Sequence, residues 1–188
     1  MINTIPYHSE KYPPKGKTLV FAPHPDDEIF GCGGAIMRHI QQKDKVEVVI
    51  VTDGGLVVHQ SQRSKNYTKI RKHESLLAAK ILGYDEPKFL DYPDGSLVTK
   101  KKLTNHLFDI ICKLKPLNIY IPAKSEIHPD HLALFHAATD AAKAYQFNVN
   151  LIYYEIGQMQ DANFLLDITD LQSILEKAMD CFQSQLVA

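Results

Sequence analysis

The fold of this chain is decided by the stretch TLVFAPHPDDE, residues 18–28, and by the glycine cluster GCGG at 31–34. Residues 18–22 are short and apolar, which is typical of a buried strand. The glycines lead into a segment with helical spacing that extends to about residue 42. Open α/β sheets carry their sites at the carboxyl ends of strands. The polar residues that follow this strand are therefore expected to form a functional site.

Composition indicates one globular domain. The chain has 188 residues, of which 45% are hydrophobic and 23% are charged, enough for a sizeable core. We expect a single domain over residues 1–188, with an irregular lead-in at 1–16 because Pro6, Pro13 and Pro14 oppose regular structure. The formal net charge of -1 argues against nucleic acid and acidic membranes as partners.

The sequence also bears on compartment and assembly. No apolar run reaches the roughly 18 residues of a spanning helix, and the N-terminal segment lacks the apolar stretch of a secretory signal. Cys32, Cys112 and Cys181 are odd in number and widely spaced, as expected for reduced thiols in the cytoplasm. Whether the chain forms a homo-oligomer is left open.

Expected strands and helices alternate along the chain. Strands are expected at 18–22, 46–52, 88–90, 117–121, 150–155 and 164–168, and helices at about 35–42, 67–82, 99–115, 131–144 and 170–183. The polar residues 56–66 are predicted to be a loop over a site. Helices of crossover length between strands predict an α/β protein with a three-layer Rossmann-like fold, a mostly parallel sheet and helices on both faces.

A second histidine motif follows the expected strand at 117–121. His128-Pro129-Asp130 repeats the tripeptide at 24–26, and His131 comes next. In a parallel sheet the two loops can converge at one edge, bringing His24 and Asp27 to one or both of these histidines. Two histidines and one carboxylate form a catalytic zinc set with an open position for water. Spacing alone does not decide which histidine of the second loop is the ligand.

Asp26 has a different expected role. Successive side chains diverge, so Asp26 is not expected to bind the same ion as Asp27. A free carboxylate beside a metal-activated water is a candidate general base.

Together these motifs resemble the PIG-L / LmbE family of zinc-dependent de-N-acetylases, whose members are similar to N-acetylglucosaminyl deacetylases. The segments RKHE at 71–74 and YPDG at 92–95 also resemble that family, and the similarity runs from about Thr18 to Gln185. The resemblance implies that His24, Asp27 and His131 bind zinc. It further implies that Asp26 is the base, that His128 stabilises the oxyanion, and that Asp130 polarises His128 and holds it cationic.

The resemblance also bears on the substrate. Arg71 and Asp94 correspond to positions at which family members contact the sugar. Asp53, which precedes Gly54-Gly55, is a candidate both for lining the cleft and for forming a turn.

The function expected from this resemblance is removal of an acetyl group from an N-acetylated amino sugar or sugar conjugate, with Zn²⁺ as cofactor. An alternative is a catalytically inactive sugar- or metal-binding module derived from the family. A metal phosphoesterase would usually need a second ion about 4 Å away, and the sequence shows no second cluster of carboxylates.

Overall fold

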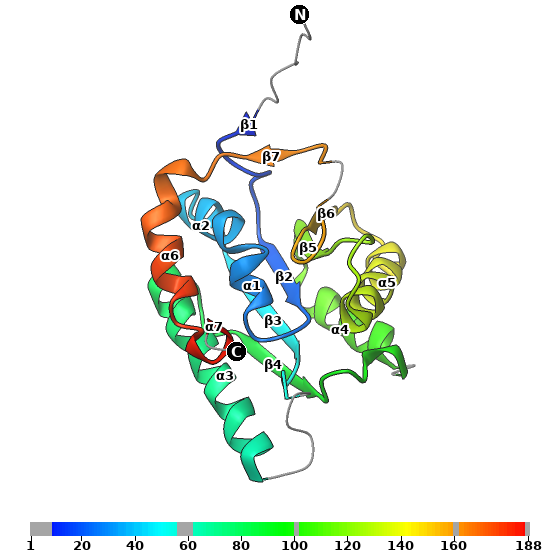
Figure 1. The fold of residues 1–188 in the computed structure, drawn as a ribbon. Helices are drawn as coiled ribbons and strands as arrows, with labels where there is room; N and C mark the ends of the chain where they lie inside the picture. The colour runs from blue at the N-terminus through cyan, green and yellow to red at the C-terminus, as the bar shows by residue number, and fades with distance from the viewer. Residues whose placement is uncertain (1–8, 56–61, 100–101, 160–161, 187–188) are drawn as a thin grey trace, which may run out of the picture.

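The computed structural model describes residues 9–55, 62–99, 102–159 and 162–186. Its central sheet has five strands, all parallel, in the order β4-β3-β2-β5-β6 (Figure 1). The strands are β2 (Thr18–Ala22), β3 (Val46–Thr52), β4 (Lys88–Tyr92), β5 (Asn118–Pro122) and β6 (Asn150–Tyr154). The predicted strands therefore form one parallel sheet, apart from the expected strand at 164–168.

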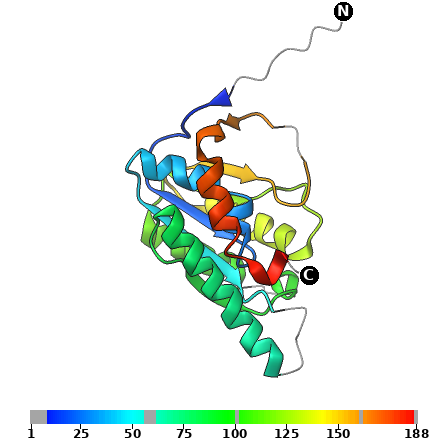
Figure 2. The ribbon, with the colours of Figure 1, turned by 60° about the vertical axis from the view of Figure 1, so that its left-hand side comes forward.

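Helices cover both faces of this sheet, as predicted. One face carries α1 (Asp27–Phe30), α2 (Gly33–Gln41), α3 (Gln62–Leu82) and α6 (Gln172–Met179), with α7 (Gln183–Leu186) beside α3. The other face carries α4 (Leu103–Leu114) and α5 (Pro129–Ala144). The described residues also include the short 3₁₀ turns η2 (Leu97–Thr99) and η3 (Thr169–Leu171). Figures 1 and 2 both show α6 packed along α3. The fold is thus three-layered and Rossmann-like.

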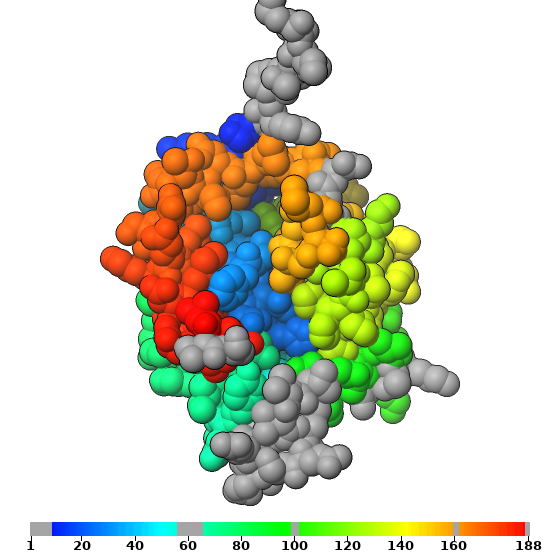
Figure 3. All heavy atoms as spheres, viewed as in Figure 1, coloured from blue at the N-terminus to red at the C-terminus, as the bar shows by residue number. Residues whose placement is uncertain are grey.

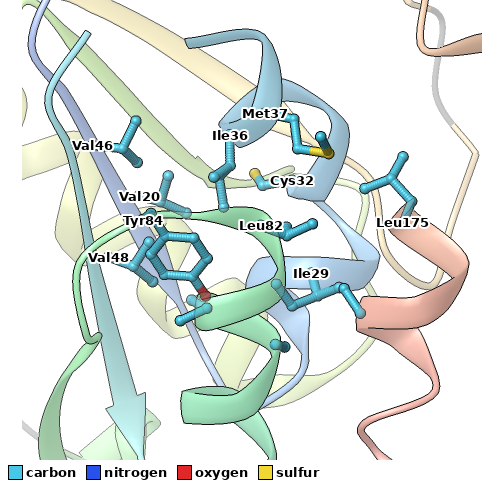
Figure 4. Close-up of a cluster of buried hydrophobic side chains, with 14 of the residues drawn as sticks. Val20, Ile29, Cys32, Ile36, Met37, Val46, Val48, Leu82, Tyr84 and Leu175 are labelled. Atoms are coloured by element: carbon cyan, nitrogen blue, oxygen red, sulfur yellow. The ribbon is translucent and has the colours of Figure 1, made fainter. Parts of the chain in front are cut away.

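The central strand β2 supplies both hydrophobic cores. Val20 and Ala22 point into the core beneath α1, α2, α3 and α6, part of which Figure 4 shows. Leu19 and Phe21 point into the core beneath α4 and α5. Because successive side chains of a strand face opposite sides, a strand buried on both faces is apolar throughout. This explains the uninterrupted apolar run at 18–22.

Two terminal segments differ from the prediction. Within the expected lead-in, Ser9–Glu10 form strand β1, which pairs in parallel with β7 (Leu165–Leu166); residues 1–8 lie outside the described residues. The strand expected at 164–168 therefore joins a separate two-stranded sheet. The guanidinium of Arg38 on α2 donates to the Asp167 carbonyl and pairs with Asp170, which binds this segment over α2.

Several boundaries also shift. Helix α3 begins at Gln62, inside the loop predicted at 56–66, while residues 56–61 lie outside the described part. The helix expected at 170–183 is divided into α6 and α7. Within the described residues no helix has the length and apolarity needed to cross a bilayer.

The strand order determines where the histidine loops lie. Strand β2 lies at the centre of the sheet. Strands β3 and β4 follow it on one side, and β5 and β6 are added on the other side. The carboxyl ends of β2 and β5 are therefore neighbours at a topological switch point, which is where open α/β sheets bind ligands. His24 follows the first of these strands and His128 the second.

Tyr154 at the end of β6 holds this region together. Its hydroxyl donates a hydrogen bond of 2.7 Å to the carbonyl of Phe21 in β2. A Cβ on Gly31, after α1, would lie 2.5 Å from the Tyr154 ring. The side chain of the preceding residue, Tyr153, points to the opposite face of the sheet and is 49% exposed. Tyr154 thus joins β6, β2 and α1 just before the His24 loop.

Replacing Tyr154 with Phe should lower the free energy of unfolding by about 1 kcal/mol, because a buried hydrogen bond is lost. The matched change Tyr153→Phe should alter it by less than about 0.5 kcal/mol, since that side chain is half exposed. Urea denaturation of the two variants measures the difference. Equal stabilities would show that the Tyr154 hydroxyl does not stabilise the fold.

Candidate metal centre

Three side chains from the two loops converge on one point. The Nδ1 atom of His24 lies 3.0 Å from Oδ2 of Asp27. The Nε2 atom of His131 lies 3.3 Å from that oxygen and 3.3 Å from Nδ1 of His24. Bonds of about 2.0–2.1 Å from a tetrahedral zinc ion put its ligand atoms about 3.3 Å apart. The triangle therefore has the dimensions of one face of a zinc coordination sphere.

The opposite ring nitrogens of both histidines face carboxylates. The Nε2 atom of His24 lies 3.2 Å from Oδ1 of Asp94 and 3.5 Å from Oδ2 of Asp130. The Nδ1 atom of His131 lies 3.2 Å from Oε2 of Glu126. Metal-binding histidines almost always hold such a partner on the second nitrogen. The surroundings of the triangle therefore also fit a zinc site.

The electrostatics favour positive charge between these side chains. Burial disfavours the Asp27 carboxylate, but hydrogen bonds from His131 and His24 outweigh it and hold the pKa of Asp27 below its usual range. Burial likewise disfavours a charged His24, yet hydrogen bonds to Asp130, Asp27 and Asp94 keep its pKa well above 6.5. A cation bound at this point would supply the same charge.

Asp26 lies beside the triangle in an unusual backbone conformation. Its φ is 136°, which residues with a Cβ rarely adopt. Its N–H donates to Oε2 of Glu28 at 2.9 Å. The Arg71 guanidinium donates to the Pro25 carbonyl and to Oδ2 of Asp26, both at 2.8 Å. Burial and the neighbouring Asp27 charge raise the pKa of Asp26 to about 7, against the opposing effect of Arg71.

His128 is the N-cap of α5, and its hydrogen bond there determines which of its ring nitrogens can carry a proton. Its Nδ1 accepts a hydrogen bond of 3.2 Å from the backbone N–H of Asp130, so a proton on this imidazole belongs on Nε2. Burial, with the charges of His24 and His131, lowers the pKa of His128 below 6.5. The cationic form that the resemblance implied for His128 stays a prediction.

The Asp130 carboxylate binds elsewhere. Its oxygens accept from the backbone N–H groups of Gly95, at 2.6 Å, and Leu97, at 3.0 Å. With Asp94 it forms a pair of carboxylates behind His24, which the sequence did not predict. Because both Asp130 oxygens already accept backbone hydrogen bonds, the pair is better suited to orienting His24 than to binding a second ion.

The comparison with known proteins agrees with this geometry. The model of the PIG-L family, described as GlcNAc-PI de-N-acetylase, matches residues 19–142. This chain belongs to the PIG-L family. The resemblance drawn from the motifs is thereby confirmed.

Relatives of this PIG-L protein include curated deacetylases. It is 26% identical over 193 residues to the diacetylchitobiose deacetylase of Thermococcus kodakarensis, covering 90% of this chain and 70% of that one. It is 27% identical over 146 residues to a probable N-acetyl-alpha-D-glucosaminyl L-malate deacetylase 2 of Bacillus anthracis, covering 73% of this chain and 64% of that one.

Solved structures share the fold. The N,N'-diacetylchitobiose deacetylase from Pyrococcus horikoshii superposes with a TM-score of 0.78 at 27% identity, covering 90% of this chain and 70% of that one. A conserved protein from Thermus thermophilus gives a TM-score of 0.77 at 27% identity, covering 90% of this chain and 79% of that one. The fold predicted from the sequence is that of these proteins.

The three residues predicted to contact substrate bind protein groups in this PIG-L structure. Arg71 is buried and donates to the Gly54 carbonyl at 2.9 Å as well as to the His24 loop. Asp94 faces His24. Asp53 accepts at Oδ1 from the N–H groups of Gly55, at 3.0 Å, and Asp94, at 3.1 Å, as a turn former does. A substrate role for them stays a prediction.

Glu126 belongs to the centre but was not predicted. It is buried and reaches His131 although no motif marks it. The available signal was an acidic residue two positions before His128, and a loop carboxylate is ordinarily solvated.

Gly54 allows Arg71 to join the two loops. Its φ is +64°, and a Cβ there would lie 2.5 Å from Nη1 of Arg71 and 2.8 Å from Cδ of Pro25. Gly83 has a similar φ of +83°, with nothing within 4 Å of a Cβ. A side chain at either glycine would strain the backbone, because both have a positive φ. Only a side chain at Gly54 would also clash with neighbouring atoms.

Gly83→Ala should therefore lower the free energy of unfolding by about 1–2 kcal/mol, for the left-handed backbone alone. Gly54→Ala should lower it by roughly 1–3 kcal/mol more, because the methyl group displaces Arg71. Urea denaturation compares the two variants. If both lose the same stability, Arg71 does not depend on the open space at Gly54.

Proposed function

We propose that this protein is a zinc-dependent hydrolase that removes the acetyl group from an N-acetylated amino sugar or sugar conjugate. The observation that carries the proposal is the triangle formed by Nδ1 of His24, Oδ2 of Asp27 and Nε2 of His131, with Asp26 and His128 beside it. Deacetylases among the relatives support the reaction type.

In this proposal His24, Asp27 and His131 hold the zinc ion. Two imidazoles and one carboxylate suit zinc better than magnesium or calcium, which prefer oxygen ligands. When bound, zinc supplies a Lewis acid for the amide carbonyl and lowers the pKa of a water molecule. The carboxylates of Asp94, Asp130 and Glu126 orient the two histidines.

Asp26 acts as the general base and then as the general acid. Its pKa of about 7 suits proton transfer near neutral pH. It takes a proton as the water oxygen bonds to the acetyl carbon. It then gives that proton to the nitrogen as the C–N bond breaks, leaving acetate and a free amine. Arg71 and Glu28 keep the carboxylate in place through their bonds to residues 25–26.

His128 donates to the oxyanion that develops on the acetyl oxygen. Because Nδ1 accepts the backbone N–H of Asp130, the Nε2–H is left to donate. A single donor of this kind contributes about 3 kcal/mol to transition-state stabilisation. Asp130 thus acts on His128 through its backbone N–H as well as through the charge of its carboxylate.

Arg71, Asp94 and Asp53 shape the sugar site by holding its loops. Asp53 bonds to the backbone of Asp94, which faces His24, and Arg71 joins the loops at 25–26 and 54. Figure 3 shows a hollow above the blue segment that carries α1, and in this proposal the sugar enters there.

Asp26→Asn should reduce kcat for deacetylation at least about 100-fold, because the base is removed, while zinc is still bound stoichiometrically. Asp27→Ala should lose both activity and zinc. The assay is acetate release from a panel of N-acetylglucosamine conjugates that includes N,N'-diacetylchitobiose, with metal analysis of each protein.

Full activity in Asp26→Asn would show that another group is the base. A zinc-loaded wild-type protein that binds these sugars and releases no acetate would instead favour the inactive binding module.

Zinc should also stabilise the folded protein. At a free concentration about 1,000 times Kd it adds about 4 kcal/mol, which raises the Tm by roughly 10 °C for a domain of this size. Thermal unfolding after chelation, and again after zinc is restored, measures the shift, and His24→Ala should abolish it. An unchanged Tm in the wild-type protein would contradict a zinc site in this triangle.

A further inference from the structure

One buried carboxylate at the metal centre, that of Glu126, also contacts the segment that follows β6. Both oxygens of Glu126 are used: Oε2 lies 3.2 Å from Nδ1 of His131, and Oε1 accepts from the N–H of Ile156 at 2.7 Å. The N–H of Gly157 lies 3.1 Å from Oε2 and 3.2 Å from Oε1. The Glu126 side chain is 1% exposed. It therefore joins His131 to the segment that follows β6.

We propose that Glu126 is a positioning residue that strengthens metal binding through His131 and couples the bound metal to the segment at 155–159. This inference rests on the proposed zinc site. It adds to that site the residue Glu126 and the contact that Glu126 makes between His131 and the segment at 155–159.

The hydrogen bond to Glu126 determines which nitrogen of His131 can bind a metal. When Nδ1–H donates to the carboxylate, the lone pair lies on Nε2. Nε2 is the atom that faces Asp27 and His24. The carboxylate also makes the imidazole a stronger electron donor. Removal of such a partner typically weakens metal binding about 10- to 100-fold.

The same carboxylate holds the segment after β6 close to the centre. A Cβ on Gly157 would lie 3.2 Å from Oε2 of Glu126, so the backbone approaches the carboxylate closely. In Figure 3 this golden segment forms one side of the hollow above α1. Because one side chain contacts both the metal-binding histidine and this segment, an ion that holds His131 also restrains the segment. By reciprocity, an ordered segment favours the ion.

Glu126→Gln keeps the shape of the side chain but removes its charge, and its amide nitrogen cannot accept a hydrogen bond. We expect zinc affinity to fall about 10- to 100-fold, measured by competition with a chromophoric chelator.

The matched control is Glu74→Gln. Glu74 is also buried and accepts two hydrogen bonds from Ser184, at 2.9 and 2.6 Å, but in this structure these bonds anchor α7. Glu74→Gln should lower the free energy of unfolding and leave zinc affinity within about twofold of the wild-type value.

Hydrogen exchange tests the coupling. Adding zinc to the wild-type protein should slow exchange of the Ile156 and Gly157 amides, and this effect should be lost in Glu126→Gln. Glu126→Asp keeps the charge, should retain more zinc affinity than the Gln variant, and serves if that variant does not fold.

Two results would overturn the inference. If Glu126→Gln, or Glu126→Asp in its place, binds zinc as tightly as the wild-type protein and changes only the stability, Glu126 is a structural anchor. If the wild-type protein itself binds no zinc, the proposed function fails as well, and the two failures are thereby distinguished.

Discussion

The parallel pairing of β2 with β5 is the constraint on which the rest of the structure depends. These strands are far apart in the sequence, and their register aligns Thr18 with Asn118 and Val20 with Tyr120. The two histidine loops therefore leave the sheet side by side. Each loop also leads into a helix: of the side chains proposed to bind the metal, His24 lies in the first loop, Asp27 begins α1 and His131 lies in the first turn of α5.

A second constraint follows from burial. The centre gathers several carboxylates and the buried imidazoles of His24 and His131, and a buried charge is costly unless it is paired and hydrogen-bonded. Here the carboxylates bond to backbone N–H groups, to imidazoles or to Arg71. This requirement explains why Arg71 and Asp94, which the sequence suggested for substrate contact, are occupied with protein groups in the structure.

Most of the fold was accessible from the sequence because its signals are local. A fully apolar strand such as β2, with polar residues directly after it, can be recognised from its own residues. The pairing of β1 with β7 could not, since both are two residues long and depend on the Arg38 contact with residues 167 and 170. The start of α3 was misplaced because its first turns are polar and lack the apolar period.

The sequence by itself determined the strand–helix alternation, the family and the two histidine motifs, because each rests on residues adjacent in the chain. Tertiary structure alone decided which nitrogen of each histidine faces the metal position, that His128 accepts a hydrogen bond from Asp130, and that Glu126 reaches His131. These outcomes depend on the directions and hydrogen-bond partners of side chains brought together by the packing of β2, β5 and β6, and sequence spacing carries no information about such directions.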